Sequence, residues 1–181
     1  MERRKILLWE MLGIVFTVLV GALLHFTFEL SGEWAPMAII SGVNESTWEH
    51  FKIGFWPAFA WGIIEFFVFG KKVKNFFFAK GISFLVIPAV ISILFYGYTF
   101  IFKIESLAID IVIFIIAIVV AQIVSYRLML LKERKLYLNI IGGVIIIINV
   151  VLFSLLSFFP PECPIFKDPV TGGYGIVEHH H

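Results

Sequence analysis

The sequence predicts an all-α protein, a five-span transmembrane helical bundle with a short interfacial helix and an irregular C-terminal tail. The chain of 181 residues is 60% hydrophobic and only 15% charged, whereas soluble domains are about 25% charged. Five apolar stretches have the length of roughly 20 residues that a helix needs to cross a bilayer. A lipid bilayer is therefore the expected partner of the chain. Its net charge of +1 gives no indication of a nucleic-acid partner.

The five predicted spans cover about residues 6–30, 50–69, 80–102, 107–127 and 136–159. The first stretch is longer than the apolar region of a signal peptide and lacks a small-residue cleavage site, so we expect it to be retained. Pro57 and Pro88 fall inside the second and third spans and should bend those helices.

A shorter apolar segment, Gly32 to Val43, lies between the first two spans. It is too short to span a bilayer, so we expect an interfacial or re-entrant helix packed against protein. The second span should begin at Asn44 or Ser46. Ser46 and Glu49 have the spacing of a capping box, in which each side chain satisfies a free backbone N–H of the other residue.

Two prolines end the fifth span, and the Pro, Gly and Asp content that follows predicts an irregular tail. We therefore divide the chain into an expected transmembrane domain (1–159), a tail on the outer face (160–177) and a purification-tag remnant (178–181). Without the tag, His25 and His50 are the native histidines. The single Cys163 excludes an intramolecular disulfide.

The distribution of basic residues predicts the orientation. By the positive-inside rule the chain is a multi-pass protein of the cell (inner) membrane, with its N-terminus cytoplasmic and its C-terminus outside. The inner side would carry Arg3, Arg4, Lys5, Lys71, Lys72, Lys74, Lys80, Arg127, Lys132, Arg134 and Lys135, and the outer segments only Lys52, Lys103 and Lys167.

Ionisable side chains gather at the predicted outer ends of the first two spans. His25 and Glu29 are four residues apart and share a helix face, and Glu45 and Glu49 have the same spacing, with His50 adjacent. Charged groups at membrane depth are costly and therefore indicate a functional site. Two imidazoles with several carboxylates suit Zn²⁺ or another divalent metal. The expected ligands are His25, Glu29, Glu45 and His50.

A metal with an open coordination position could activate water, so the site would be hydrolytic if it is catalytic. Glu49 would then be the general base or a further ligand. Residues expected around the site or in a lid over it are Asn44, Asp110, Asp168 and Tyr174. Simpler roles stay open: Glu49 as a capping residue, Glu29 and Glu45 as solvated interfacial charges, and His25 as an inter-helix hydrogen-bonding group.

Two other functions are compatible with the sequence. A small cation or proton transporter or channel would need a polar route from Glu29 to Glu10 or Glu65, although ion pairs of these two residues with nearby basic residues explain them more simply. The other alternative function is that of a non-catalytic protein in which His25 and His50 hold a haem. Whether the protein is an enzyme, and whether it forms a homo-oligomer, stay open.

The segment NESTWEHFK after the first span and the tail CPIFKDPVTGGYGI resemble an uncharacterised family of small bacterial multi-pass membrane proteins over nearly the whole chain. This resemblance implies the membrane fold and no particular reaction. The polar cluster is also similar to the site of the ceramidase and adiponectin-receptor type of membrane zinc hydrolases. That superfamily implies three zinc-binding histidines and seven spans, whereas this chain has two native histidines and five predicted spans.

Overall fold

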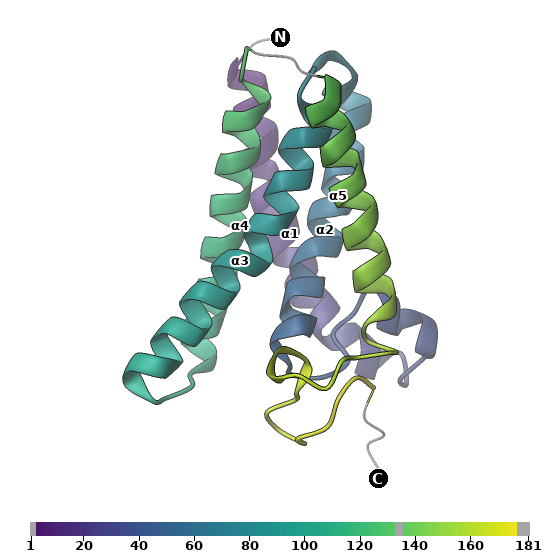
Figure 1. Ribbon diagram of the computed structural model, residues 1–181, viewed down its shortest axis with the longest axis vertical. Helices are drawn as coiled ribbons and strands as arrows, with labels where there is room; N and C mark the ends of the chain where they lie inside the picture. Colours follow the sequence, from purple (N-terminus) through teal and green to yellow (C-terminus); the bar gives the residue numbers. More distant parts are fainter. Residues whose placement is uncertain (1–2, 133–135, 177–181) are drawn as a thin grey trace.

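The computed structural model describes residues 3–132 and 136–176 and contains five long helices that run along one another (Figure 1). They are α1 (Arg3–Leu30), α2 (Thr47–Val68), α3 (Phe76–Phe102), α4 (Leu107–Met129) and α5 (Leu136–Leu155). All five are long and apolar enough to cross a membrane. The described ranges contain no β-strand. The predicted all-α bundle of five spans is confirmed.

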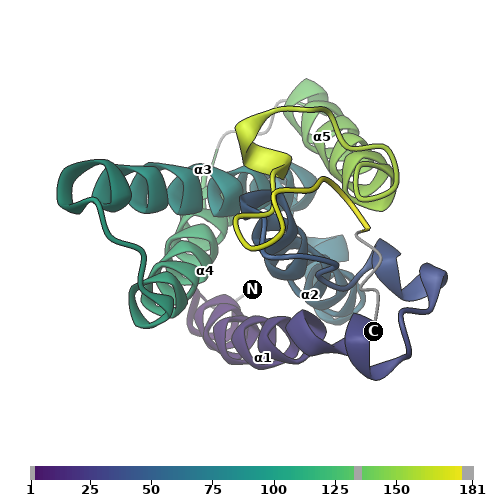
Figure 2. The same ribbon diagram turned by 90° about the horizontal axis from the view of Figure 1, so that it is seen from below.

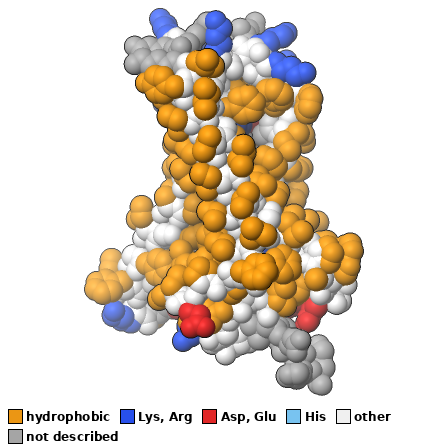
Figure 3. Space-filling model, turned by 45° about the vertical axis from the view of Figure 1, so that its right-hand side comes forward, with side chains coloured by type: hydrophobic (Ala, Val, Ile, Leu, Met, Phe, Trp, Pro, Cys, Tyr) orange, Lys and Arg blue, Asp and Glu red, His pale blue; other side chains and the backbone are white. Residues whose placement is uncertain are grey.

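Helix α3 packs closely against α4 and α5, and α1 packs against α2 and α4. The largest apolar core lies between α2, α3, α4 and α5. In this core the ring of Phe55 lies 5.3 Å from that of Phe84 and 4.8 Å from that of Phe153. The outer surface of the bundle is a belt of leucine, isoleucine, valine and phenylalanine side chains (Figure 3). Such a belt is what a helix bundle presents to lipid.

Short elements connect the helices. The predicted interfacial helix is present as the 3₁₀ helix η1 (Ala35–Ile39), and two further 3₁₀ turns, η2 (Gly70–Lys72) and η3 (Pro164–Phe166), follow α2 and α5. Ser46 caps α2, but the expected capping box does not form. The backbone N–H of Ser46 donates instead to Asn44 Oδ1 at 2.8 Å, because Glu49 is engaged elsewhere.

Two lysines that we expected in loops lie inside helices. Lys52 is fully buried in α2, and Lys80 is 2% exposed in α3. Each is paired with carboxylates, which stabilises a charge away from water. The assignment of these two residues to the loop charges was therefore wrong.

Most of the remaining exposed basic residues lie at one end of the bundle (Figure 3), whereas Lys103 and Lys167 lie at the opposite end. The first of these ends, called here the basic end, carries Arg3, Arg4, Lys5, Lys71, Lys72, Lys74, Arg127 and Lys132. The opposite end carries η1, the loop before α2 and the tail (Figure 1). Arg134, Lys135 and the histidines at 179–181 lie outside the described residues.

A buried cluster of polar groups joins four segments at the end opposite the basic end. Lys52 Nζ lies 2.5 Å from Glu49 Oε2 and donates to the carbonyl of Ala38 at 2.7 Å and to Ser157 Oγ at 2.6 Å. Glu49 in turn accepts hydrogen bonds from Ser157 Oγ at 2.7 Å and from the N–H of Val43 at 3.2 Å. One ion pair therefore ties α2 to η1, to the loop before α2 and to the end of α5.

Replacing Lys52 by Met should lower the free energy of unfolding by about 3–5 kcal/mol, because it leaves the Glu49 carboxylate buried without a counter-charge. Thermal or denaturant unfolding in detergent measures this loss. The double variant Lys52→Met/Glu49→Met should recover part of it. The exposed Lys167→Met is the matched control, and a Lys52→Met variant as stable as that control would contradict the role given to the ion pair.

Candidate metal centre

The loop before α2 is docked onto the outer part of α1 by one serine. Ser41 is fully buried, and its Oγ accepts the N–H of Phe28 at 2.9 Å and donates to the carbonyl of Leu24 at 2.5 Å. The N–H of Gly42 also donates to the Leu24 carbonyl, at 3.3 Å. A side chain inserted into a helical hydrogen-bond ladder fixes the position of the intruding loop. The loop is therefore held beside His25, the residue that follows Leu24.

This docking brings together three ionisable side chains from three segments: His25 of α1, Glu45 of the loop and His50 in the first turn of α2. The Oε2 atom of Glu45 lies 3.5 Å from His25 Nε2 and 3.8 Å from His50 Nε2. The centroids of the two imidazole rings are 5.4 Å apart. One potential ligand atom from each residue lies within 4.8 Å of the others. We call these residues the His–Glu–His cluster.

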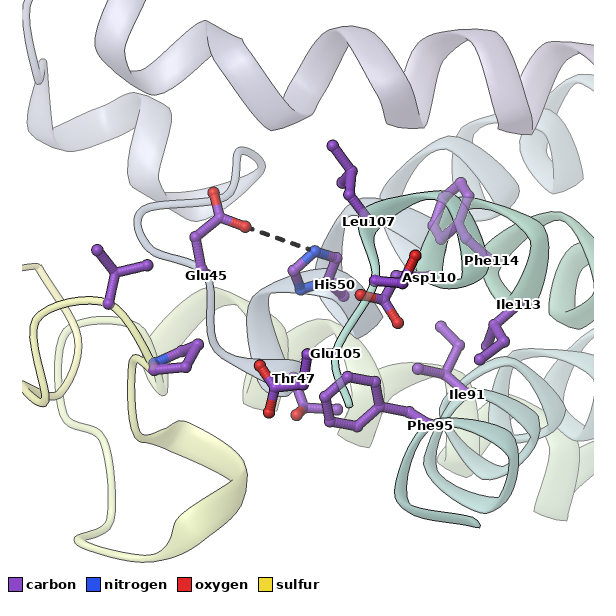
Figure 4. A pocket seen from close by; sticks show the side chains of 13 residues that line it. Glu45, Thr47, His50, Ile91, Phe95, Glu105, Leu107, Asp110, Ile113 and Phe114 are labelled. Carbon is purple, nitrogen blue, oxygen red and sulfur yellow. Dashed lines mark ion pairs between the residues drawn. The ribbon is translucent and has the colours of Figure 1, made fainter. Parts of the chain in front are cut away.

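The hydrogen bonding of His50 orients its ring for ligation. His50 Nδ1 lies 2.9 Å from the carbonyl oxygen of Ser46. A carbonyl oxygen only accepts hydrogen bonds, so Nδ1 carries the proton of this bond. In the neutral ring the lone pair is then on Nε2, which faces Glu45 (Figure 4). This arrangement, a backbone carbonyl holding the other ring nitrogen, is the usual support of a metal-binding histidine.

The spacing within the cluster suits a small metal ion better than direct hydrogen bonds. Hydrogen bonds between nitrogen and oxygen are about 2.7–3.2 Å long, and both contacts of Glu45 are longer. Ligand atoms about 2.0–2.1 Å from a tetrahedral zinc ion would lie about 3.3 Å from one another. The two distances from Glu45, 3.5 and 3.8 Å, are close to that spacing, and all three ligand atoms lie within 4.8 Å of one another.

Two cavities meet at the cluster. One, of about 270 Å³, is lined by Glu45 and His50, by Asp110 of α4 and by Pro169 and Val170 of the tail. The other, of about 240 Å³, lies between α1, α2 and α4, and its lining is mostly apolar apart from His25, His50 and Asp110. Glu45 and Asp110 lie on opposite sides of the His50 ring (Figure 4). A ligand in the first cavity would therefore reach His50, and one in the second would reach both histidines.

The bend of α3 leaves room for the larger cavity. The second half of α3 and the start of α4 lean away from α1 and α2 (Figures 1 and 2). Pro88 lies in the middle of α3, and a proline inside a helix breaks the hydrogen-bond ladder and bends it. Asp110 lies at the start of α4, in the part of the bundle that leans away, and its Oδ1 accepts a hydrogen bond from the Tyr98 hydroxyl of α3 at 2.7 Å.

Two of the expected site residues lie outside the cluster. Glu29 is exposed on α1 and is not in the group of converging ligand atoms. Glu49 is 2% exposed, and its carboxylate is directed to Lys52 and Ser157. Ser41, Pro169 and Val170 have site roles that we did not expect from the sequence, because no sequence pattern marks which loops dock where.

The tail lies across the end of the bundle opposite the basic end (Figure 2), and its residues Pro169 and Val170 line part of the first cavity. Asn44 Nδ2 donates to the carbonyl of Gly175 at 2.7 Å and so ties the tail to the loop before α2. Asp168 is 3% exposed and accepts hydrogen bonds within its own turn from the N–H groups of Val170 and Thr171. Tyr174 pairs with Lys167 in an isolated bridge. Pro169 and Val170, rather than Asp168 or Tyr174, therefore line the cavity.

The surroundings of Glu45 and Asp168 lower the pKa of both carboxyl groups and so favour their ionised forms. The contact with the His25 imidazole, together with the charge of His50, holds the pKa of Glu45 below its ordinary value despite partial burial. Burial raises the pKa of Asp168, but hydrogen bonds from Thr171, Val170 and the backbone of Glu45 outweigh this effect and lower the pKa overall. An ionised Glu45 between two imidazoles is the form that binds a cation.

The carboxylates at the other end of the bundle do not pair with the basic residues that we expected. Glu10 and Glu65 both pair with the buried Lys80, whereas Arg3 and Lys71 are exposed. The ion-pair interpretation is supported, but with a different partner.

Replacing His25 by Leu should raise the pKa of Glu45 towards the ordinary value of a glutamate, because it removes the largest lowering contact. Since the Glu45 pKa is lower in the folded protein than in the unfolded chain, this contact stabilises the fold above the ordinary pKa. The stabilisation is lost as the pH falls through the lowered value. Titration of ¹³C-labelled glutamate by NMR measures the shift. The exposed Glu29→Gln is the control, and an unchanged Glu45 titration in His25→Leu would contradict the contact.

Comparison with known proteins places the chain in one family. Residues 2–176 match the sequence model of a family described as a family of unknown function (DUF6512). Neither the curated proteins nor the solved structures gave a match. The match covers nearly the whole chain and agrees with the resemblance to an uncharacterised family. The chain thus belongs to this family of unknown function.

Proposed function

We propose that the protein is an integral membrane protein with a divalent-metal site, formed by His25, Glu45 and His50, that opens to the outer face of the membrane. The observation that carries this proposal is the convergence of the three ligand atoms within 4.8 Å of one another. Two imidazoles and one carboxylate are a ligand set that zinc uses in catalytic sites. The side chains of His25 and His50 are 26% and 28% exposed, so the centre would be partly accessible.

The proposed chemistry is metal-assisted hydrolysis. Three protein ligands leave a fourth position for water, whose pKa zinc lowers to about 7. That position would face the cavity shared by His50 and Asp110. Asp110, rather than the buried Glu49, is then the candidate general base, and the Tyr98 hydroxyl orients its carboxylate. The mainly apolar lining of the second cavity supports a substrate with an apolar part.

The orientation supports an outward-facing site. The basic end carries most of the exposed lysines and arginines of the described residues, whereas Lys103 and Lys167 lie at the opposite end of the bundle with the His–Glu–His cluster. By the positive-inside rule the basic end would be cytoplasmic. The site and the tail over it would then face the outer side of the cell membrane.

The geometry favours a single metal ion over a haem. In a bis-histidine haem the macrocycle lies between the two imidazoles. Here the ring centroids are 5.4 Å apart, the rings are inclined by 63°, and Glu45 contacts both. A transport route is also less favoured: Gly21 of α1 faces the ring of Phe114, so an apolar contact lies between the buried polar residues at the basic end and His25.

Protein freed of its C-terminal histidines should bind one zinc or cobalt ion per chain. The variants His25→Ala and His50→Ala should each reduce this to background, because two remaining ligands hold the ion weakly. Binding should weaken below about pH 6.5, where protons compete for the imidazoles. Elemental analysis and calorimetric titration measure stoichiometry and affinity.

The matched controls are Glu29→Gln, which changes an exposed carboxylate one turn from His25, and the untagged parent protein. Both should keep the metal. Absence of a stoichiometric ion in the parent, or full retention in both histidine variants, would refute the proposal.

A further inference from the structure

A second cluster of buried ionisable groups lies near the basic end and plays no part in the metal centre. It consists of Glu10 on α1, Glu65 on α2 and Lys80 on α3, and we call it the Glu–Glu–Lys cluster. These residues are 2%, 0% and 2% exposed. Three different helices thus each place one charged group at one point in the interior.

The two carboxylates have unequal surroundings. Lys80 Nζ lies 3.1 and 3.3 Å from the two oxygens of Glu10, and Ser125 Oγ of α4 donates to Glu10 Oε1 at 2.7 Å. Glu65 forms an ion pair with Lys80 through Oε2, but no hydroxyl of the described residues donates to it as Ser125 does to Glu10. Glu10 is therefore well solvated by the protein, whereas the fully buried Glu65 is not.

The charges of the cluster do not balance. Two ionised carboxylates and one ammonium have a net charge of −1. Lys52 and Lys80 are the buried basic side chains of the described ranges, and Lys52 is paired with Glu49 at the opposite end. The other basic groups on the elements around the cluster are exposed at the basic end: Arg3, Arg4 and Lys5 of α1, Lys71 and Lys72 of η2, Lys74 before α3 and Arg127 of α4. The acidic groups Glu29 of α1, Glu49 of α2 and Asp110 of α4 lie towards the opposite end.

An apolar layer separates the cluster from these exposed charges. Ile6, Phe69, Phe76 and Met129 are all buried and belong to one apolar cluster. Each of these residues lies four positions, about one helical turn, nearer the basic end than a residue of the polar cluster. The pairs are Ile6 with Glu10, Phe69 with Glu65, Phe76 with Lys80, and Met129 with Ser125. An uncompensated charge behind such a layer would destabilise the fold strongly.

We propose that the Glu–Glu–Lys cluster is a proton-binding site that holds one exchangeable proton at neutral pH. The proton binds a carboxylate oxygen and forms an O–H bond, while the Lys80 ammonium stays charged, so that the cluster becomes neutral. Glu65, which lacks the hydroxyl donor that Glu10 has in Ser125, is the carboxyl that carries this proton, although protons of closely coupled groups belong to the pair. The site is independent of the metal centre and provides an acid–base group in the half of the bundle nearest the basic end.

Infrared spectroscopy of the purified full-length protein at neutral pH tests this directly, with a protonated carboxyl recognised by its carbonyl band and by the shift of that band in D₂O. The wild type should show one such band. Glu65→Gln and Glu10→Gln should each abolish it, because the remaining carboxylate then balances Lys80. Lys80→Met should increase it about twofold, because both carboxylates then need a proton.

Glu29→Gln is the control and should keep the band. No protonated carboxyl in the wild type would overturn the proposal, and so would a band that survives in both Glu65→Gln and Glu10→Gln. If one of these variants does not fold, the other makes the same prediction. The metal content of the protein has no bearing on either result.

Discussion

The ion pair between Glu49 and Lys52 is the interaction on which the end of the molecule with the His–Glu–His cluster depends. An apolar bundle can hold a charge in its interior only if an opposite charge and hydrogen bonds surround it. Here Ala38, Val43 and Ser157 supply those hydrogen bonds. The pair therefore fixes η1, the loop before α2 and the end of α5 around the first turn of α2. His50 is next to Glu49 in that turn, so its position follows from the same contacts.

The two buried charge clusters show what such groups can do in this fold. Glu49 and Lys52 balance each other and are fully hydrogen-bonded, so they suit a fixed structural role. The Glu–Glu–Lys cluster joins α1, α2 and α3 but has one more carboxylate than ammonium. The same requirement for neutrality that makes the first cluster rigid makes the second a place for a proton. The difference in charge balance therefore gives the Glu49–Lys52 pair a structural role and the Glu–Glu–Lys cluster a proton-binding role.

The fold could be predicted from the sequence because composition alone identifies five apolar stretches, and a bilayer accepts few structures other than helices. Of the four ligands expected from the sequence, the structure brings together His25, Glu45 and His50, which residue type and depth singled out. Glu29, which was grouped with them on helix spacing, is not among the converging side chains. The actual neighbour of His25 comes from a loop positioned by Ser41. Lys52 was assigned to a loop although its spacing of three from Glu49 already allowed a pair on one helix face.

The central claim is that His25, Glu45 and His50 hold one metal ion, and X-ray absorption spectroscopy of the zinc-loaded protein without its C-terminal histidines tests it most directly. The account predicts a first shell of nitrogen and oxygen at about 2.0–2.2 Å, with the outer-shell scattering of two imidazoles, and loss of this zinc signal in His50→Ala. A shell of oxygen atoms alone, or a spectrum unchanged in His50→Ala, would contradict it.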